Sequence, residues 1–435
     1  MTRDAAQHAL HVLESVLRSD RARILARVVS IVGDLQYAED ALQEASVDAA
    51  REWPLSGVPL NPQGWLVTVA RRRAIDRYRS LAASSRREKS LYERALTFDA
   101  EPDDAPVPDD RLRLIFTCCH PALAPEVQVA LTLYVVGGLT TSEVASAFMV
   151  SDTTMAQRIT RGKRKIRETG IAYRVPAREE LSKRLEPVLA TIYLIFTTGY
   201  LAPTGAAVVR VDLLDEALRL VDLVCELLDG HAEVLGLAAL MHLTDARRAT
   251  RLDVQGTPID LAHQDRSQWN SDQITRGLTL LSRARSCNEP GPYQIQAAIA
   301  AVHARASDAD HTDWAMIATL YDGLMALAPS PVVAMNRAVA IGLSRGAEAG
   351  LTLLDEPELR HSLRRHHRYY VARGHLLELS GDDDGAQRAW DQALELPMSA
   401  HERTALLDHR GAKKPQKVMF DDASTPATII STPAE

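Results

Sequence analysis

The stretch TTSEVASAFMVSDTTMAQRITRGKRKIRE, residues 140–168, predicts two short helices joined by a tight turn. Thr140 can cap the first helix, and Glu143, three residues later, can return the bond in a capping box. The buried side of the second helix is marked by spacings of four, three and four, at Met155, Ile159, Gly162 and Ile166. A different side carries Thr154, Gln157, Arg158, Arg161 and Lys165. Because Arg and Gln read base edges and Thr and Lys reach phosphates, the pattern predicts a helix-turn-helix whose second helix enters a major groove.

The same pattern also fits an ordinary amphipathic helical hairpin with a solvated basic face. Residues 151–170 hold six Lys or Arg and two acidic residues, in a chain whose formal net charge is -7. Local basicity within an acidic chain favours a dedicated patch for a polyanion.

Composition indicates an all-α protein of two to four domains: 435 residues, 46% hydrophobic, 5% aromatic and almost without alternating strand patterns. Four cysteines in this length are no disulfide framework, so a reducing cytoplasm is the expected location. The start of the chain, MTRDAAQHAL, lacks the layout of a signal peptide. The most apolar run, residues 189–196, is too short to span a bilayer, so no membrane association is expected.

An acidic face is predicted near the start of the chain, where residues 8–53 indicate two or three helices. In YAEDALQEA, residues 37–45, the alanines and Leu42 face inward at helical spacing. The exposed side is expected to hold Glu39, Asp40, Gln43 and Glu44. Such a face is either simply solvated or docks on a partner.

A second basic segment follows a loop predicted at residues 54–62, PLSGVPLNP. The helix that begins at Gln63 leads into residues 71–90, which hold eight Lys or Arg and two acids, so a polyanion is the natural partner. Trp65 and Tyr78 are interpreted as core residues; the alternative is that unpaired bases stack on them.

Taken together, AEDALQEA, a loop, GWLVTVARRRAIDRYRS, an acidic spacer and a helix-turn-helix containing QRITRGKRKIRE resemble the extracytoplasmic-function (ECF) group of bacterial RNA polymerase sigma factors. The first block is similar to sigma region two and the second to sigma region four, over about residues 8–172. The resemblance implies a sigma factor that binds core RNA polymerase and directs promoter recognition, on duplex DNA and on the melted non-template strand.

The resemblance also implies roles for matching positions. The polymerase clamp helices would be gripped by Asp34, Glu39, Asp40, Gln43 and Glu44. The minus-ten element would be met by Arg71, Arg72, Arg73, Asp76, Arg77 and Arg79, with the loop at residues 56–63 capturing a flipped base. The minus-thirty-five element would be read by Thr153, Thr154, Gln157, Arg158, Arg161 and Lys165. The implied domains are region two at 1–90, a linker at 91–110 and region four at 111–175.

Two segments between the blocks have open interpretations. Residues 96–110 hold six acids, no bases and three prolines, which predicts an extended segment. It is either a soluble linker or, by the resemblance, a segment threading toward the polymerase active-site channel. Cys118, Cys119 and His120 are soft ligands, but they are adjacent, whereas metal ligands are normally spaced by two or more residues. Buried packing is the preferred interpretation, and no metal or cofactor is expected.

The remainder, residues 176–411, is predicted to be a helical, tetratricopeptide-like domain, followed by a disordered tail at 412–435. Ala338 and Ala372 lie 34 residues apart in similar contexts, and the segments starting at Tyr321 and Trp390 lie 69 apart. A period of about 34 residues is typical of tetratricopeptide helix pairs, here expected for residues 315–400. Such a stack binds a peptide or another domain, or it packs as a fixed brace on the sigma regions.

Three hypotheses for function remain after this sequence reading. The first is a sigma factor modulated in cis by its C-terminal domain, and by the resemblance this domain would replace a separate anti-sigma factor. The second is a regulator that binds duplex DNA without polymerase, and the third is a scaffold with a vestigial DNA-binding head. A plain regulator needs neither the acidic face nor the second basic block, which favours the first. No catalytic constellation stands out, so an enzyme is not expected.

Overall fold

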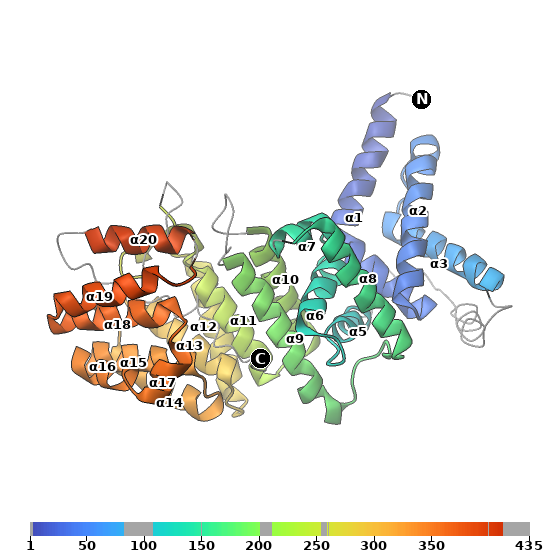
Figure 1. Cartoon of the computed structure of the whole chain (residues 1–435). Coiled ribbons are helices and arrows are strands. Elements are labelled where there is room, and N and C mark those ends of the chain that lie inside the picture. The colour runs from blue at the N-terminus through green and yellow to red at the C-terminus, as the bar shows by residue number, and fades with distance from the viewer. Residues whose placement is uncertain are drawn as a thin grey trace. The chain divides into compact units, whose positions relative to one another are not determined.

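The computed structural model describes residues 3–81, 108–148, 150–200, 211–253, 259, 261–398 and 400–411. Over these ranges the chain forms helices and connecting loops without a β-strand, so the all-α prediction is confirmed (Figure 1). The chain divides into two compact units, Met1–Thr191 and Ile192–Glu435. Among the helices of the described residues, none is long and apolar enough to cross a membrane.

Three helices that pack on one another begin the first unit (Figure 1). They are α1 (Arg3–Val32), α2 (Leu35–Ser56) and α3 (Pro62–Leu81). Their apolar stripes meet in a core that includes Leu25, Leu42 and Leu66, which are almost fully buried. Asp34 caps α2, because its carboxylate accepts hydrogen bonds from the backbone N–H groups of Gln36 and Tyr37.

Helix α2 runs further than the sequence predicts. The loop expected from residue 54 begins only at Gly57, because Pro54 is accommodated inside the last turns of the helix. The buried Trp53 packs edge-to-face on Trp65 of α3, with ring centroids 5.5 Å apart, which holds this turn in place. Gly57 ends α2 with φ of 91°, a backbone conformation that suits glycine, and donates to the carbonyl of Trp53.

The second part of this unit contains the helix-turn-helix. Its elements are α5 (Pro108–Cys118), α6 (Pro125–Leu131), the π-turn η1 (Thr132–Val136), α7 (Thr141–Ala147) and α8 (Asp152–Glu168). The predicted capping box of α7 is present, since Thr140 and Glu143 exchange both hydrogen bonds. Ser151 caps α8 by accepting from the backbone N–H of Thr154. The two short helices and their turn are therefore confirmed.

Residues 108–110, which were expected to be extended, instead form the first turn of α5. The buried carboxylate of Asp110 lies 3.5 Å from Arg27 of α1 and 3.3 Å from Arg113 one turn later. These ion pairs hold the acidic end of the spacer in the folded part of the first unit. The rest of the acidic spacer, residues 96–107, lies outside the described residues.

The second unit starts within α9 (Arg178–Tyr200), whose first half belongs to the first unit. It continues with α10 (Val211–Leu227), α11 (Ala232–Asp245), the 3-10 turns η2 (Arg248–Thr250) and η3 (Arg266–Gln268), α12 (Ser271–Ser286) and α13 (Pro292–Arg305). Helix α11 is buried along its whole length and packs against α10, α12 and α13. It is therefore the central helix of this part of the core.

The last helices follow one another in space as they do in sequence (Figure 1). They are α14 (Trp314–Leu327), α15 (Pro331–Arg345), α16 (Ala347–Leu354), α17 (Pro357–Leu363), α18 (His367–Ser380), α19 (Asp383–Leu394) and α20 (Ala400–Gly411). Helix α15 packs on α14 and α16, α18 on α16 and α19, and α20 on α19. The tail expected to be disordered, residues 412–435, lies outside the described residues.

Candidate nucleic-acid interface

Helix α8 has one buried and one exposed side, as its sequence predicts. Met155, Ile159, Gly162 and Ile166 are all buried. Gly162 allows close packing on α6, since a Cβ atom there would lie 2.6 Å from a side-chain carbon of Val127. The hydroxyl of Thr154 also lies 2.8 Å from that of Ser151, so this residue takes part in the cap.

The residues predicted to read the minus-thirty-five element lie on the exposed side of α8. Arg158 is half-buried, and the remaining five are exposed, namely Thr153, Thr154, Gln157, Arg161 and Lys165. Arg158, Arg161 and Lys165 line a shallow groove of about 250 Å³ together with the start of α6, which adds Glu126. The guanidinium of Arg161 donates to the backbone carbonyl of Gln157, which keeps the side chain along the helix. The arrangement offers donors in a row to an anionic or base-edge ligand.

The residues predicted to dock on polymerase divide into a buried and an exposed group. Gln43 and Glu44 are exposed, and Asp40 is half-buried. Asp34 and Glu39, in contrast, are only 6% and 8% exposed. The expectation that Glu39 lies on the solvent side of α2 is therefore wrong, because region four covers that side at this position.

Glu39 is surrounded by donors from three other elements. Lys163 of α8 and the hydroxyl of Tyr134 in η1 both donate to its carboxylate. Arg21 of α1 donates to the same carboxylate at 2.9 Å. Burial alone would raise the pKa of Glu39, but the charge of Lys163 and the hydrogen bonds from Lys163 and Tyr134 outweigh burial and lower it. The carboxylate is therefore held in its charged form.

Asp34 has a double role at the start of α2. Besides capping this helix, it accepts from Arg167 of α8 at 3.1 and 3.3 Å. The guanidinium of Arg167 also lies 4.8 Å from the ring centroid of Tyr37. Sequence reasoning missed Lys163 and Arg167 as functional residues, since their partners lie 124 and 133 residues away.

The residues predicted to meet the minus-ten element lie along α3. Arg71 is half-buried, and Arg72, Arg73, Asp76 and Arg77 are exposed, while the side chain of Arg79 lies outside the described part. Two of these arginines pair with α2: Arg73 lies 2.5 Å from Asp48, and Arg77 lies 3.1 Å from Asp40. Ion pairs of exposed arginines are weak in water, so both arginines can exchange partners at little cost.

A groove of about 440 Å³ runs between α2 and α3. Its lining contains both the exposed docking residues and the two paired arginines: Asp40, Gln43, Glu44, Val47, Asp48, Arg51, Arg73 and Arg77. The predicted docking face and the predicted minus-ten face are therefore adjacent. In the neighbouring loop, expected to capture a flipped base, Leu60 is fully exposed. Trp65, expected in the core, is half-buried, and the side chain of Tyr78 lies outside the described part.

The adjacent pair Cys118 and Cys119 is fully buried at the end of α5. Burial raises the pKa of both thiols, that of Cys119 to about 11, so neither is a reactive thiolate at neutral pH. The sulfur of Cys119 lies 3.3 Å from the hydroxyl of Thr132. Within the described ranges, no group of three His, Cys, Asp or Glu side chains is arranged to hold a metal.

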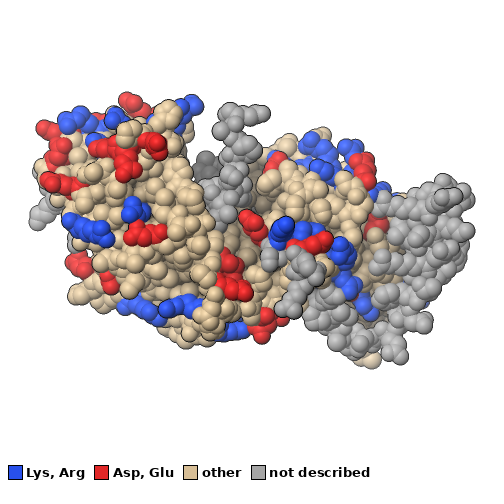
Figure 2. Space-filling model, turned by 90° about the horizontal axis from the view of Figure 1, so that it is seen from below, with Lys and Arg blue, Asp and Glu red and all other residues tan. Residues whose placement is uncertain are grey.

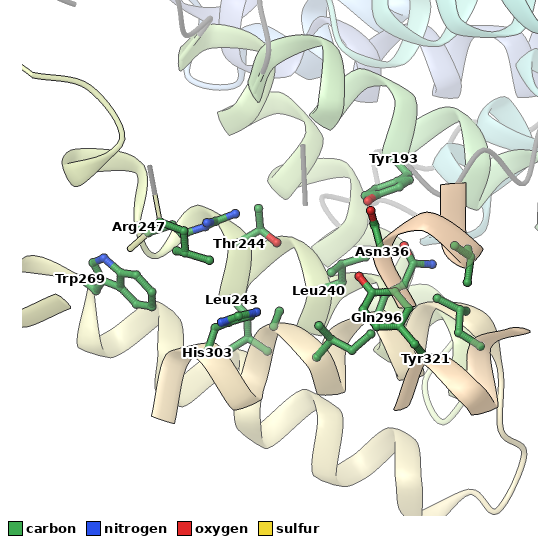
Figure 3. Close-up of a pocket in the computed structure, with 15 residues that line it drawn as sticks. Tyr193, Leu240, Leu243, Thr244, Arg247, Trp269, Gln296, His303, Tyr321 and Asn336 are labelled. Atoms are coloured by element: carbon green, nitrogen blue, oxygen red, sulfur yellow. The ribbon is translucent and has the colours of Figure 1, made fainter. Parts of the chain in front are cut away.

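A small cavity lies in the second unit (Figure 3). Arg247, Trp269 and His303 gather at one end, and Tyr193, Gln296, Tyr321 and Asn336 at the other (Figure 3). Its volume is about 40 Å³. That volume suits a few water molecules, whereas pockets for drug-sized ligands measure roughly 300–1,000 Å³. The cavity is therefore not a ready-made cofactor site.

Comparisons with known families agree with this geometry. Residues 16–84 match sigma-70 region 2, residues 113–166 match sigma-70 region 4, and residues 184–285 match a family of unknown function (DUF6596). An uncharacterized protein of Rhizobium meliloti (strain 1021), R00370, is 39% identical over 413 residues, covering 92% of this chain and 96% of that protein. No solved structure matches the chain.

Two similar proteins carry functional names. The probable ECF RNA polymerase sigma factor SigI of Mycobacterium tuberculosis is 31% identical over 174 residues, covering 38% of this chain and 59% of SigI. The ECF RNA polymerase sigma factor SigK of Mycobacterium ulcerans is 31% identical over 141 residues, covering 32% of this chain and 74% of SigK.

Regions two and four together define a sigma-70-type factor of transcription initiation. The chain belongs to the ECF group of RNA polymerase sigma factors and carries a long helical C-terminal extension. Sigma factors bind core RNA polymerase and promoter DNA.

Proposed function

We propose that this sigma factor docks on polymerase through α2, opens promoter DNA at α3 and reads the minus-thirty-five element with α8. The single observation that carries the proposal is the two-sided character of α8. Its buried stripe fixes the helix in region four, while Thr153, Gln157, Arg161 and Lys165 remain exposed on the other side. A helix that binds the major groove of duplex DNA needs one buried and one exposed side, because its side-chain donors must be accessible to the base edges.

Region two supports the remaining steps of the proposal. Arg72 and Arg77 supply exposed positive charge for the DNA backbone, and the exposed Leu60 in the adjacent loop offers apolar surface next to an unstacked base. Asp40, Gln43 and Glu44 line the groove between α2 and α3 together with Arg77. Polymerase docking through α2 would thus bring the melted strand and the enzyme to neighbouring surfaces.

Gel filtration of the purified chain with core polymerase tests the docking step. We expect the chain to co-elute with polymerase and to add promoter-specific binding that neither component has alone. A chain that never joins polymerase, yet binds duplex DNA by itself, would contradict the proposal and identify a plain DNA-binding regulator.

We also propose that the second unit modulates initiation in cis. The starts of its last helices recur: α14, α16 and α19 begin at residues 314, 347 and 383, and α15, α18 and α20 at 331, 367 and 400. These intervals of 33 to 36 residues support tetratricopeptide-like helix pairs. In one repeat two short helices, α16 and α17, stand in place of a single helix, and α17 begins at Pro357. Such a stack presents a surface that suits a peptide or a protein domain.

Charge supports a protein partner over a nucleic acid for this stack. On the face that Figure 2 shows, Lys and Arg lie interspersed with Asp and Glu over the C-terminal helices. A nucleic-acid surface would instead gather cations. A photo-crosslinking residue in place of Met316 or Leu379, both exposed, tests this in reconstituted holoenzyme. A crosslink to polymerase or to residues 1–191 supports the proposal; no crosslink from either position contradicts it.

A cleavable chain tests the modulation itself. A protease site inserted between α9 and α10, within residues 201–210, allows the chain to be cut after the holoenzyme has formed. We expect the initiation rate to change on cutting, upward for an inhibitory extension and downward for a required one. Equal rates before and after cutting, with the C-terminal fragment removed, would contradict modulation in cis.

A further inference from the structure

Region four covers part of the acidic face of α2 in this structure. Lys163 donates to Glu39, and Arg167 donates to Asp34 at 3.1 Å. The side chain of Lys163 is 9% exposed and that of Glu39 is 10% exposed, so this ion pair is largely removed from solvent. These are two of the residues that the proposed function assigns to polymerase docking.

Further contacts between the two regions surround this ion pair. Arg21 of α1 donates to the backbone carbonyl of Tyr134 at 2.9 Å. The ring of Tyr134 lies beneath the ammonium of Lys163, 4.6 Å from its centroid, and its hydroxyl donates to Glu39. Beyond α8, the hydroxyl of Tyr173 donates to the carbonyl of Ala26 in α1 at 3.0 Å.

The contact between region four and α2 leaves the exposed side of α8 uncovered. Lys163 and Arg167 are one helical turn apart, beside the buried stripe, whereas Arg161 and Lys165 remain exposed. On α2, the contact covers Asp34 and Glu39 near the start of the helix and leaves Gln43 and Glu44 in solvent. The DNA-reading side is therefore open while the docking face is half covered.

We propose that the first unit is a closed form, in which Lys163 and Arg167 hold region four over the docking face of α2 until core polymerase displaces it. This inference rests on the proposed function, since it takes α2 to be the polymerase-docking helix. Polymerase would first meet the exposed half of the face, at Asp40, Gln43 and Glu44. It would then compete with region four for Asp34 and Glu39.

Closure lowers the apparent affinity for polymerase in proportion to the fraction of open molecules. The double variant Lys163→Gln/Arg167→Gln, made in the full chain, removes both cations and leaves the proposed docking residues unchanged. We expect its dissociation constant for core polymerase to fall by about ten-fold or more, because the open fraction rises. Arg164→Gln is the matched control and should leave the affinity unchanged, since Arg164 pairs within α8, with Glu168 at 3.6 Å.

A distance measurement reports closure without polymerase. Donor and acceptor dyes are attached through Val47→Cys in α2 and Thr160→Cys in α8, since both positions are exposed. The half-buried Cys225 and Cys287 are replaced by serine so that they do not take up dye. We expect energy transfer to fall in the double variant and, in the wild type, on addition of core polymerase. Tyr173→Phe, which removes a separate bond between the regions, should shift both readouts in the same direction by a smaller amount.

The outcomes separate the inference from the proposed function. The closed form alone would be overturned if the wild type binds polymerase but the double variant and Tyr173→Phe show no change. In that case neither variant would bind polymerase more tightly, and neither would show lower energy transfer. Failure of the wild type and of every variant to bind polymerase would overturn the proposed function, and the inference with it. Circular dichroism and thermal unfolding show that each variant is folded before it is compared.

Discussion

At the scale of single residues, we propose that Arg158 and Arg161 are the side chains of α8 that read bases. Both line the groove beside α6, and Arg161 stands fully on the exposed side. Their guanidinium groups can donate two parallel hydrogen bonds to a guanine edge. Lys165, one turn further on, is placed for a phosphate.

We predict that Arg158→Ala and Arg161→Ala each weaken minus-thirty-five recognition by roughly 1–3 kcal/mol, the usual cost of a lost base contact. The measurement is binding of the holoenzyme to a promoter that the wild type selects from genomic DNA, compared with the same promoter carrying a scrambled minus-thirty-five element. Arg285→Ala, an equal change of charge at an exposed position of α12, is the control. Unchanged selectivity in both α8 variants would exclude this helix as the reader.

Glu39 gives a prediction about pH. The pKa of Glu39 is lowered in the folded chain. Its charged carboxylate therefore stabilises the fold fully when the pH is above the pKa of glutamate in the unfolded chain. This stabilisation is lost as the pH falls through the lower pKa of the folded chain. We predict that Glu39→Gln destabilises the first unit by roughly 3 kcal/mol at pH 7, since it breaks a buried ion pair. Thermal unfolding of both chains between pH 7 and 3.5 should show this difference shrinking at acid pH. A difference independent of pH would contradict the charged pair.

Some residue roles were readable from the sequence, and others were not. The buried stripe of α8 and its exposed polar side follow from helical periodicity, which needs only residues within the helix. The burial of Glu39 was missed because periodicity places a residue on a side of its own helix and cannot say what covers that side. Lys163 and Arg167 carried no signal for the same reason.

At the scale of elements, the helices begin and end mainly at local signals. The capping box at Thr140 and the cap at Ser151 fix the helix-turn-helix as predicted. The sequence predicts a loop from Pro54, whereas packing of Trp53 on Trp65 carries α2 to Ser56. Pro54 has no N–H to donate to the carbonyl of Ala50, and tertiary packing offsets the loss of that hydrogen bond.

The contact between α15 and α16 depends on a glycine. A Cβ at Gly350 would lie 2.6 Å from the backbone carbonyl of Ala338 and 2.8 Å from the Cα of Gly342. We predict that Gly350→Ala destabilises the second unit by about 1–3 kcal/mol, because backbone atoms cannot yield as side chains do. Thermal unfolding monitored by circular dichroism measures the effect.

The matched control is Gly323→Ala in α14. A Cβ at this position meets only Ile295, at 3.4 Å, so the added methyl group fits. Alanine is the better helix former by up to about 1 kcal/mol, and we expect unchanged or raised stability. Equal losses in both variants would contradict the close approach of α15 and α16.

At the scale of the whole molecule, the order of segments carried more information than any single motif. An acidic helix, a basic helix and a helix-turn-helix in one chain indicated the class of protein before any coordinates. The helical character of the extension was also readable from the sequence, whereas its period of about 34 residues stays a prediction. The contact between regions two and four was not, because it joins residues more than a hundred positions apart through a few charged pairs.

Run-off transcription tests the central claim most directly. Full-length chain and core polymerase are supplied with the selected promoter, and the transcript is compared for the wild type, Arg161→Ala and Arg285→Ala. We predict a discrete promoter-dependent transcript with the wild type and with Arg285→Ala, and a much weaker one with Arg161→Ala. No transcript from any selected promoter, while the chain alone still binds the same duplex, would contradict its action as a sigma factor.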